Sequence, residues 1–326
     1  MTLALGNMGD HEARGQEGRN EFHRQEFPNR ILNSQMIRIL GTAFAALVGL
    51  AFGSFLNVCL SRWPEGESVV KPRSHCRNCD HILAWWENIP LLSWVILRGR
   101  CRKCRAPISW RYPLVEITVG LLWAISAWRL TAELLDAQLP VSLVYYDFAR
   151  MISSFILFWL LVALAALDVE NLWLPNFLTI PGVLIGLAVC VANEIFGYHF
   201  DTGIRPFHVL CARALSVLAA AGLILLIRWI YWLIRRREGI GLGDAKLMAM
   251  LAAWLGLPGA LLAFSLGVVL GSITALVLLV IPPTGSIEIG WTAQKLPLGT
   301  FLCIGGVISA LWGQPILAAY LHWAGF

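Results

Sequence analysis

Long apolar runs alternate with short polar stretches along most of the chain. Uncharged runs occupy residues 39–61, 151–167, 171–193, 247–287 and 296–326. A membrane-spanning helix needs roughly 20 mostly apolar residues, so each run predicts at least one span. The run at 247–287 is long enough for two helices. The Gly and Pro residues within 255–260 predict the turn between them.

Two further apolar runs contain charged residues. Residues 113–128 include Glu116, and residues 206–234 include Arg213 and Arg228. With these two runs the pattern predicts about eight transmembrane helices and an all-α polytopic membrane protein. Glu116 has two interpretations. It is either a buried carboxylate tied to a nearby arginine or backbone group, or a contact to a substrate amine or a cofactor.

The composition agrees with a membrane protein. Hydrophobic residues make up 58% of the 326 residues and charged residues only 14%, whereas a soluble domain carries about 25% charged residues. The pattern divides the chain into a polar, disordered tail (1–36), a first span (37–61), a polar insertion (62–112) and a membrane domain (113–326).

The charges of the insertion predict the orientation in the membrane. Residues 62–112 contain ten Lys and Arg residues against four acidic ones, which is typical of a cytoplasmic loop. Eight crossings then place the polar stretches around Asp168 and Asp244 on the same, cytoplasmic side. Topology and anionic lipid account for the net charge of +5, so we expect membrane lipid and no nucleic acid as a partner.

The insertion contains two Cys-x-x-Cys pairs, Cys76/Cys79 and Cys101/Cys104, separated by 21 residues. Two such turns supply the four thiolates of a closed, tetrahedral Zn²⁺ site, which is structural because it has no open position. A redox pair, another metal or unligated thiols are the alternatives. Zinc would add folding free energy to a segment that is too small and too polar for a large core.

Two aspartates lie at helix boundaries on the predicted cytoplasmic side. Asp168 follows one apolar run, and Asp244 follows Gly241 and Gly243 and opens another. Either aspartate alone is explained as a helix cap or a loop residue. As a close pair, two carboxylates share a proton, so that one activates water and the other hydrogen-bonds the scissile carbonyl of a peptide. The two glycines would let a peptide backbone approach closely.

Six stretches in order along the chain resemble the bacterial prepilin peptidases, which are membrane aspartic proteases of the GxGD class. They are GSFLNVCLSRWP from residue 53, the paired Cys-x-x-Cys loop, ISWRYPLVEITVGLLW from 108, LDVENLWLPNFLTIPG from 167, GLGDAKL from 241 and KLPLGTFLCIGG from 295.

The resemblance implies a multi-pass protein of the bacterial inner membrane that cleaves type IV prepilins or type II secretion pseudopilins. Cleavage follows a glycine that ends a short basic leader, on the cytoplasmic side. Asp168 and Asp244 take the catalytic positions by motif. Many members also methylate the new N-terminus with S-adenosylmethionine, and the cysteine loop and the RYPLVE stretch are linked to that step.

Other residues have supporting roles in this hypothesis. Many relatives read Asp-x-Asp where this chain has Asp168-Val-Glu170, so Glu170 is a lengthened second acid. Lys246 lies near Asp244 but on another helix face, where lipid headgroups or the cofactor are its expected contacts. Two other classes of function compete with the peptidase. One is an ion or solute transporter with a regulatory zinc domain, and the other is a peptidase-like fold that only binds or assembles.

Overall fold

The computed structural model describes residues 35–136, 141–196, 206–237, 239, 241–280 and 296–325. The predicted disordered tail lies outside this part of the chain, apart from residues 35 and 36, which begin the first helix. Within the described ranges there are two isolated β-bridges and no strand. The prediction of an all-α protein is therefore confirmed.

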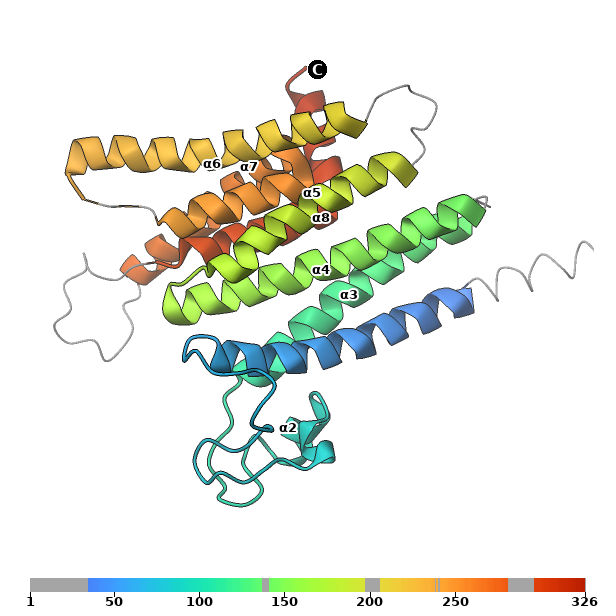
Figure 1. Ribbon diagram of the computed structural model, residues 1–326, viewed down its shortest axis with the longest axis vertical. Helices are drawn as coiled ribbons and strands as arrows, with labels where there is room; N and C mark the ends of the chain where they lie inside the picture. Colours follow the sequence, from blue (N-terminus) through green and yellow to red (C-terminus); the bar gives the residue numbers. More distant parts are fainter. Residues whose placement is uncertain are drawn as a thin grey trace, which may run out of the picture.

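Seven of the described helices are long and apolar enough to cross a membrane. The other two, η1 and α2, are short and belong to the insertion (Figure 1). In chain order the helices are Gln35–Arg62, η1 (Trp85–Asn88), α2 (Leu92–Ile96), α3 (Arg111–Asp136), α4 (Val141–Asn171), α5 (Asn176–Phe196), α6 (Pro206–Arg235), α7 (Leu242–Val280) and α8 (Leu298–Trp323).

Helix α7 contains the turn predicted near residues 255–260. Gly256 has a φ of 74° and a ψ of 174°, which lie outside the helical region, and Pro258 follows two residues later. Before this break α7 runs beside α5, with Trp254 Nε1 donating to the Gly182 carbonyl at 2.8 Å. After the break it runs beside α8, with Ser309 Oγ donating to the Gly259 carbonyl at 2.8 Å.

The direction of α7 reverses at this break. Lys246 bonds Asn176, the first residue of α5, so the first part of α7 runs parallel to α5. The second part is antiparallel to α8, because Gly259 lies against Ser309 while Gly267 lies against Leu302. Helices α5 and α8 begin at the same end of the bundle, so α7 turns back on itself. The prediction of about eight crossings is thus met by seven helices, one of which is a hairpin.

Two arginines inside the spans each bond a group on a neighbouring helix. Arg129 of α3 donates to the carbonyl of Leu311, which lies four residues before Pro315 and therefore has no helical N–H donor. Arg213 of α6 donates to Cys190 Sγ at 3.1 Å and lies against Gly256. Their charges are therefore compatible with spanning helices.

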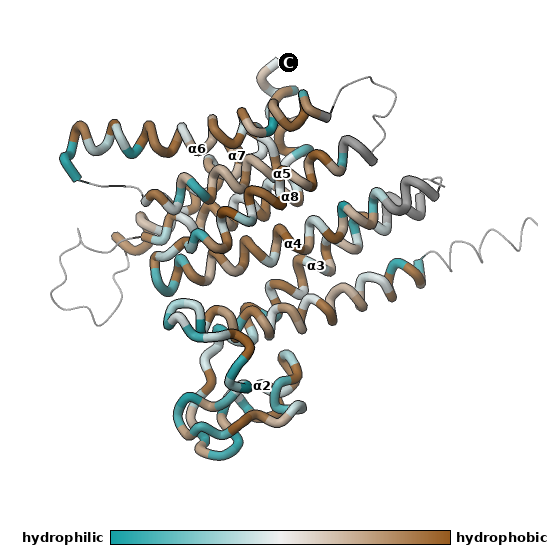
Figure 2. Tube along the Cα trace, in the orientation of Figure 1, coloured by the Kyte–Doolittle hydropathy of each residue, from teal (hydrophilic) through white to brown (hydrophobic). Residues whose placement is uncertain are grey.

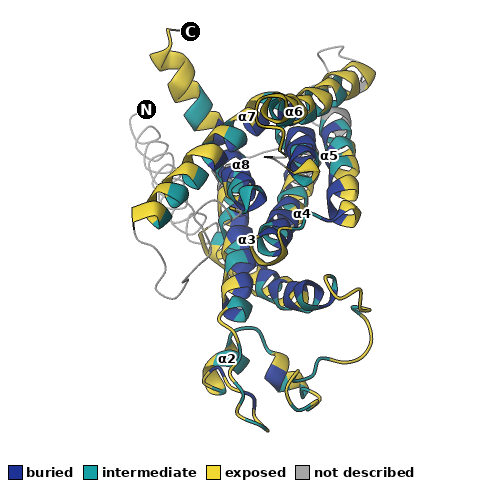
Figure 3. Ribbon diagram, turned by 90° about the vertical axis from the view of Figure 1, so that its left-hand side faces the viewer, coloured by how far each residue is buried: buried dark blue, intermediate teal, exposed yellow. Residues whose placement is uncertain are grey.

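The first helix packs closely on α3 through small residues. A Cβ at Gly53 would lie only 2.7 Å from the Cα of Glu116, so the two backbones touch at this point. The packing side of α4 and α8 is buried, whereas much of α6 is exposed (Figure 3). In a membrane, lipid covers such exposed apolar faces.

The residues between the first helix and α3 form a compact polar unit, which we name the cysteine module (residues 63–110). Figure 2 shows that hydrophilic residues are concentrated there, while the long helices are mostly hydrophobic. The module lies beside the C-terminal part of the first helix and the start of α3 (Figure 1). The buried Arg62 anchors it by donating to the carbonyls of Ser68 at 2.8 Å and Pro72 at 2.7 Å.

Candidate active site and metal centre

Asp168 lies in the last turn of α4 and is 5% exposed. The first turn of α8 holds its carboxylate. The backbone N–H of Thr300 donates to Oδ2 at 2.7 Å, and the Thr300 hydroxyl is 3.1 Å from the same oxygen. Gly299 allows this approach, because a Cβ there would lie 2.9 Å from Oδ2. The two Thr300 contacts both reach Oδ2, so they fix the orientation of this carboxylate.

Asp244 lies in the first turn of α7 and is 7% exposed. The N–H of Gly241 donates to its Oδ2 at 3.1 Å, which is a bond typical of a helix N-terminus. Gly243 packs against Leu174, and a Cβ at this glycine would lie 3.0 Å from the Leu174 Cβ. The glycines therefore shape the start of α7 itself. Their predicted role toward a peptide backbone stays a prediction.

The structure brings the two aspartates together. Asp168 and Asp244 are close enough to interact electrostatically. Leu174 lies between the two aspartate-bearing segments, because it packs against both Gly243 and Gly299. Residues 76 positions apart in the sequence thus share one buried site where α4 ends and α7 and α8 begin.

Glu170 and Lys246 lie at the edge of this site, and each bonds another group. Arg111 Nη1 donates to Glu170 Oε2 at 2.7 Å, which ties the end of α4 to the start of α3. Lys246 Nζ donates to Asn176 Oδ1 at 2.6 Å, which ties the start of α7 to the start of α5. Each contact thus ties a helix end that carries an aspartate to the start of a neighbouring helix.

Glu116 is buried at the junction between the first helix, α3 and the cysteine module. Its Oε2 accepts the N–H of Leu91 at 2.8 Å, and the side chains of Ser54 and Asn57 lie beside it. Asn57 in turn donates to the Tyr112 carbonyl at 2.9 Å. Glu116 therefore bonds a backbone group, as one of the two interpretations expects, and faces the module.

The first Cys-x-x-Cys pair forms a tight turn. The N–H of Asp80 donates to the carbonyl of Cys76 at 2.9 Å, and the N–H of Cys76 donates to the carbonyl of His81 at 3.0 Å. Asp80 has a φ of 53°, in the left-handed region, which lets the chain turn back after Cys79.

The second pair repeats this turn. The N–H of Arg105 donates to the carbonyl of Cys101 at 3.0 Å, and the N–H of Cys101 donates to the carbonyl of Ala106 at 2.8 Å. Arg105 has a φ of 62°, in the left-handed region like Asp80 in the first turn. Two equivalent turns thus present Cys101 and Cys104 to the first pair.

All four sulfur atoms lie within 4.8 Å of one another. Cys76 and Cys104 are 3.8 Å apart, and Cys79 and Cys101 are 4.0 Å apart. These distances fit four ligands around one tetrahedral ion and exceed an S–S bond length. Among the residues that the structure describes, this is the group that could hold a metal ion.

The thiols influence one another's protonation. The backbone N–H of Ala106 and the amide of Asn78 lower the pKa of Cys104 to about 6. The N–H of His81 lowers the pKa of Cys79, but partial burial and the other three cysteines outweigh it and raise that pKa to about 12. Four thiolates at this distance need a cation, so the residues fit a metal of the Zn²⁺ type.

Both histidines next to the first pair have partners outside the thiol group. A ring nitrogen of His81 lies 3.1 Å from Glu87 Oε2, which also accepts the N–H of Ala84 at 2.8 Å. His75 Nδ1 lies 3.1 Å from the Arg73 carbonyl. Burial raises the pKa of the Glu87 carboxyl. The hydrogen bonds from Ala84 and His81 and the charges of His81 and Arg102 outweigh this effect, so the net shift of the pKa is downward.

Sequence reasoning missed three residues of the aspartate site. Thr300 holds Asp168, Asn176 holds Lys246, and Leu174 packs between the glycines. Thr300 lies within the stretch from residue 295 that resembles the family, but the resemblance assigns it no role. Only the fold shows that this helix start meets the end of α4.

Comparison with known proteins matches both halves of the chain to family models. The model described as the bacterial peptidase A24 N-terminal domain matches residues 47–130, and the type IV leader peptidase family matches residues 155–276. No solved structure matches the chain.

Several curated relatives carry the name prepilin leader peptidase/N-methyltransferase. One from Myxococcus xanthus is 40% identical over 71% of this chain and 62% of its own length. One from Stutzerimonas stutzeri is 33% identical over 86% of this chain and 93% of its own. One from Pseudomonas putida is 31% identical over 86% and 94%. These names do not favour the transporter alternative. The chain belongs to the type IV leader peptidase family.

Proposed function

We propose that this chain is a prepilin peptidase in which Asp168 and Asp244 cleave the leader from type IV prepilins or type II secretion pseudopilins. The observation that carries the proposal is the meeting of two buried carboxylates, from α4 and α7, at one end of the bundle. Relatives that align with most of the chain bear the corresponding name.

The mechanism follows from a pair of acids that share one proton. The ionised carboxylate takes a proton from water, and the resulting hydroxide attacks the scissile carbonyl carbon. The protonated carboxyl donates a hydrogen bond to the carbonyl oxygen and stabilises the charge that develops there. The amine then leaves with a proton returned by the pair. No covalent acyl-enzyme forms.

Thr300 and Gly241 would position the pair. The two bonds from Thr300 to Oδ2 fix the plane of the Asp168 carboxylate, and the Gly241 N–H fixes Asp244. Glu170 and Lys246 act indirectly, through the helix ends that they join.

The location follows from the same proposal. We place the aspartate site and the basic cysteine module on the cytoplasmic side of the inner membrane, in agreement with the positive charges of the module. The substrate's apolar helix stays in lipid while its leader junction reaches Asp168 and Asp244.

Cys76, Cys79, Cys101 and Cys104 would hold one structural Zn²⁺. Its contribution is folding free energy for the module, because four thiolates leave no open coordination position. The module and the adjoining Glu116 would serve the second activity, which is methylation of the new N-terminus from S-adenosylmethionine.

One assay tests both activities. Purified protein in detergent is incubated with a prepilin and labelled S-adenosylmethionine, and wild type is compared with Asp168→Ala and Asp244→Ala. Wild type should cleave and methylate. Each variant should leave the leader intact but still label a pre-cleaved pilin. Cleavage by either variant at the wild-type rate contradicts the peptidase assignment.

A further inference from the structure

Two cavities border the first helix and differ in their suitability for a charged ligand. The larger one, of about 660 Å³, lies between the first helix, α3 and α4 and is lined almost wholly by apolar side chains. The smaller one, of about 490 Å³, lies between the first helix and the cysteine module and is half polar in its lining. Small-molecule sites fall in this size range and combine apolar walls with a few polar groups.

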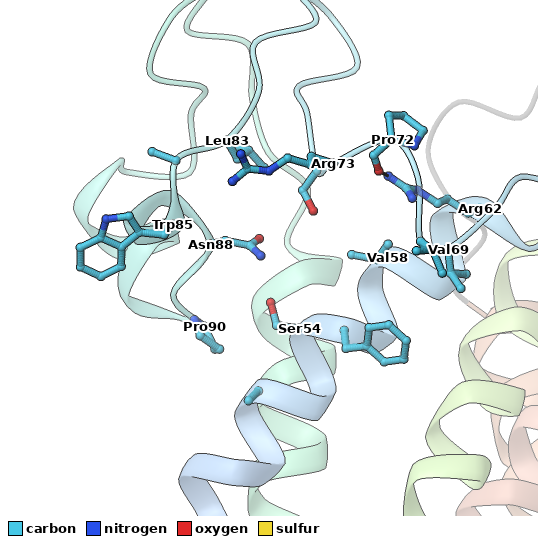
Figure 4. Close-up of a pocket in the computed structure, with 15 residues that line it drawn as sticks. Ser54, Val58, Arg62, Val69, Pro72, Arg73, Leu83, Trp85, Asn88 and Pro90 are labelled. Atoms are coloured by element: carbon cyan, nitrogen blue, oxygen red, sulfur yellow. Dashed lines mark hydrogen bonds between the residues drawn. The ribbon is translucent and has the colours of Figure 1, made fainter.

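Polar groups from two separate segments converge on the smaller cavity. Figure 4 shows the Ser54 hydroxyl of the first helix and the Asn88 amide of the module turned toward the same space, with the Arg73 guanidinium above them. Val58 and Leu83 supply apolar walls, so the ligand that fits has both charged and apolar parts.

The two arginines of the cavity differ in their availability. Arg62 is committed to the carbonyls of Ser68 and Pro72 and is buried. The guanidinium of Arg73 makes no hydrogen bond or ion pair within the described ranges, and the same holds for the side-chain amide of Asn88. Arg73 therefore offers a free bidentate site for a carboxylate, and Asn88 offers a donor and an acceptor together.

We propose that this cavity binds the methyl donor S-adenosylmethionine, an inference that rests on the methyltransferase half of the proposed function. The guanidinium of Arg73 pairs with the α-carboxylate of the donor. The amide of Asn88 bonds the adenine edge, and the exposed indole of Trp85 at the rim offers a face for the base.

The position of the cavity suits the acceptor as well as the donor. Phe55 lines both cavities, so the polar one borders the apolar groove within the membrane spans. Glu116 is buried behind the Ser54 wall and does not line the cavity, so its contacts with Ser54 and the Leu91 N–H hold that wall in place. A pilin N-terminus carried on an apolar helix thus reaches the cavity without leaving the membrane surface.

Bound S-adenosylmethionine supplies a methyl group on a sulfonium sulfur. After the ammonium has lost a proton to water, the amine nitrogen attacks the methyl carbon. The new N–C bond forms as the C–S bond breaks, and the electron pair of that bond returns to sulfur as S-adenosylhomocysteine. The product nitrogen is a secondary ammonium, so the transfer balances with no further proton loss.

Binding of the donor is the direct test. Labelled S-adenosylmethionine is equilibrated with full-length wild type, Arg73→Gln, Asn88→Ala and the Arg73→Gln/Asn88→Ala double variant in detergent. The matched control is Arg100→Gln, because Arg100 is an exposed arginine of the same module that lines neither cavity. Zinc content measured on each sample reports whether the module is folded.

The proposal predicts at least tenfold weaker binding for each single variant, no measurable binding for the double variant and wild-type binding for Arg100→Gln. Wild-type affinity in the folded double variant overturns the cavity assignment but leaves the methyltransferase function standing. If wild type cleaves prepilin but binds no donor, both the cavity assignment and the methyltransferase function are overturned. The last outcome concerns lipid. If anionic phospholipid added at fixed detergent displaces the donor, and Arg73→Gln does not change donor binding, the cavity binds lipid headgroups and the proposal is overturned.

Discussion

The aspartate site and the cysteine module reach defined geometries by opposite means. Asp168 and Asp244 are fixed by long helices whose backbones are already hydrogen-bonded, so a few contacts at the helix ends are enough. The module has short helices, two isolated bridges and many exposed apolar side chains. It depends on turn hydrogen bonds and on four converging thiols. One region is positioned by the helix bundle and the other by local turns that bring its thiols together.

This difference predicts that the module can be broken alone. Cys101→Ser removes the buried member of the thiol group, and a closed four-thiolate zinc site is worth on the order of 10 kcal/mol of folding free energy. The variant should lose zinc, measured by metal analysis, and the module should become sensitive to protease. Cys190→Ser, at a cysteine in α5, is the matched control and should retain about one zinc per chain. A Cys101→Ser protein with full zinc content contradicts the metal site.

The aspartate site should respond to loss of a single positioning contact. Thr300→Val removes the hydroxyl bond to Asp168 and keeps the backbone bond. A hydrogen bond to a charged group contributes about 1.5 to 3 kcal/mol, so kcat for prepilin cleavage should fall about 10- to 100-fold.

Rescue separates positioning from simple structural damage. Thr300→Ser restores the hydroxyl and should recover most of the rate. Thr274→Val removes a hydroxyl that bonds only its own helix and should cleave like wild type. If Thr300→Ser is as slow as Thr300→Val, the hydroxyl is not what positions Asp168.

Acid should weaken the module through Glu87. The folded-state pKa of this carboxyl lies below its ordinary value of 4.5, so its charge stabilises the fold at neutral pH. This contribution is complete above the unfolded-state pKa and disappears as the pH falls through the folded-state pKa.

Glu87→Gln should therefore lower the stability of the module by about 1 kcal/mol at pH 7, and the difference from wild type should vanish in acid. Thermal unfolding of both proteins, monitored by zinc release at several pH values between 7 and 3, measures this difference in stability. Glu67→Gln, at an exposed position, should match wild type throughout. A Glu87→Gln difference that grows on acidification has the wrong sign for this account.

The smallest effect is expected where the two regions meet. Arg111 and Glu170 join the start of α3 to the end of α4, but both side chains are partly exposed. Such pairs contribute about 0 to 1 kcal/mol, so Arg111→Gln and Glu170→Gln should each slow cleavage less than fivefold. A double-mutant cycle on cleavage rate measures the coupling, and a hundredfold loss in Glu170→Gln would instead give this acid a direct catalytic role.

Much of this architecture was predictable because lipid imposes strong rules on sequence. Uncharged runs of about 20 residues located the spans, and Gly256 and Pro258 located the turn inside α7. The cysteine spacing likewise predicted which thiols converge. In each case local chemistry leaves few alternatives.

The parts that sequence reasoning missed are contacts between distant segments. Nothing near Thr300 indicates that its N–H and hydroxyl reach Asp168, which lies 132 positions earlier. The contact between Gly243 and Leu174 likewise joins segments about 70 positions apart, and the sequence alone does not indicate it. The cavity beside Arg73 could not be predicted from the sequence either, because it forms where the module meets the first helix.

The most direct test of the paired aspartates is single-turnover cleavage of a prepilin by Asp168→Asn, Asp244→Asn and the double variant. Asp147→Asn, at a buried aspartate of the same helix α4, is the matched control. We predict that each single variant loses roughly 10²- to 10⁴-fold in cleavage rate. The double variant should be no slower than the single variants, because the two acids act as a unit. Asp147→Asn should cleave at the wild-type rate. Near-normal cleavage by either single variant, or a double variant whose loss is the product of the two single losses, would contradict a catalytic pair.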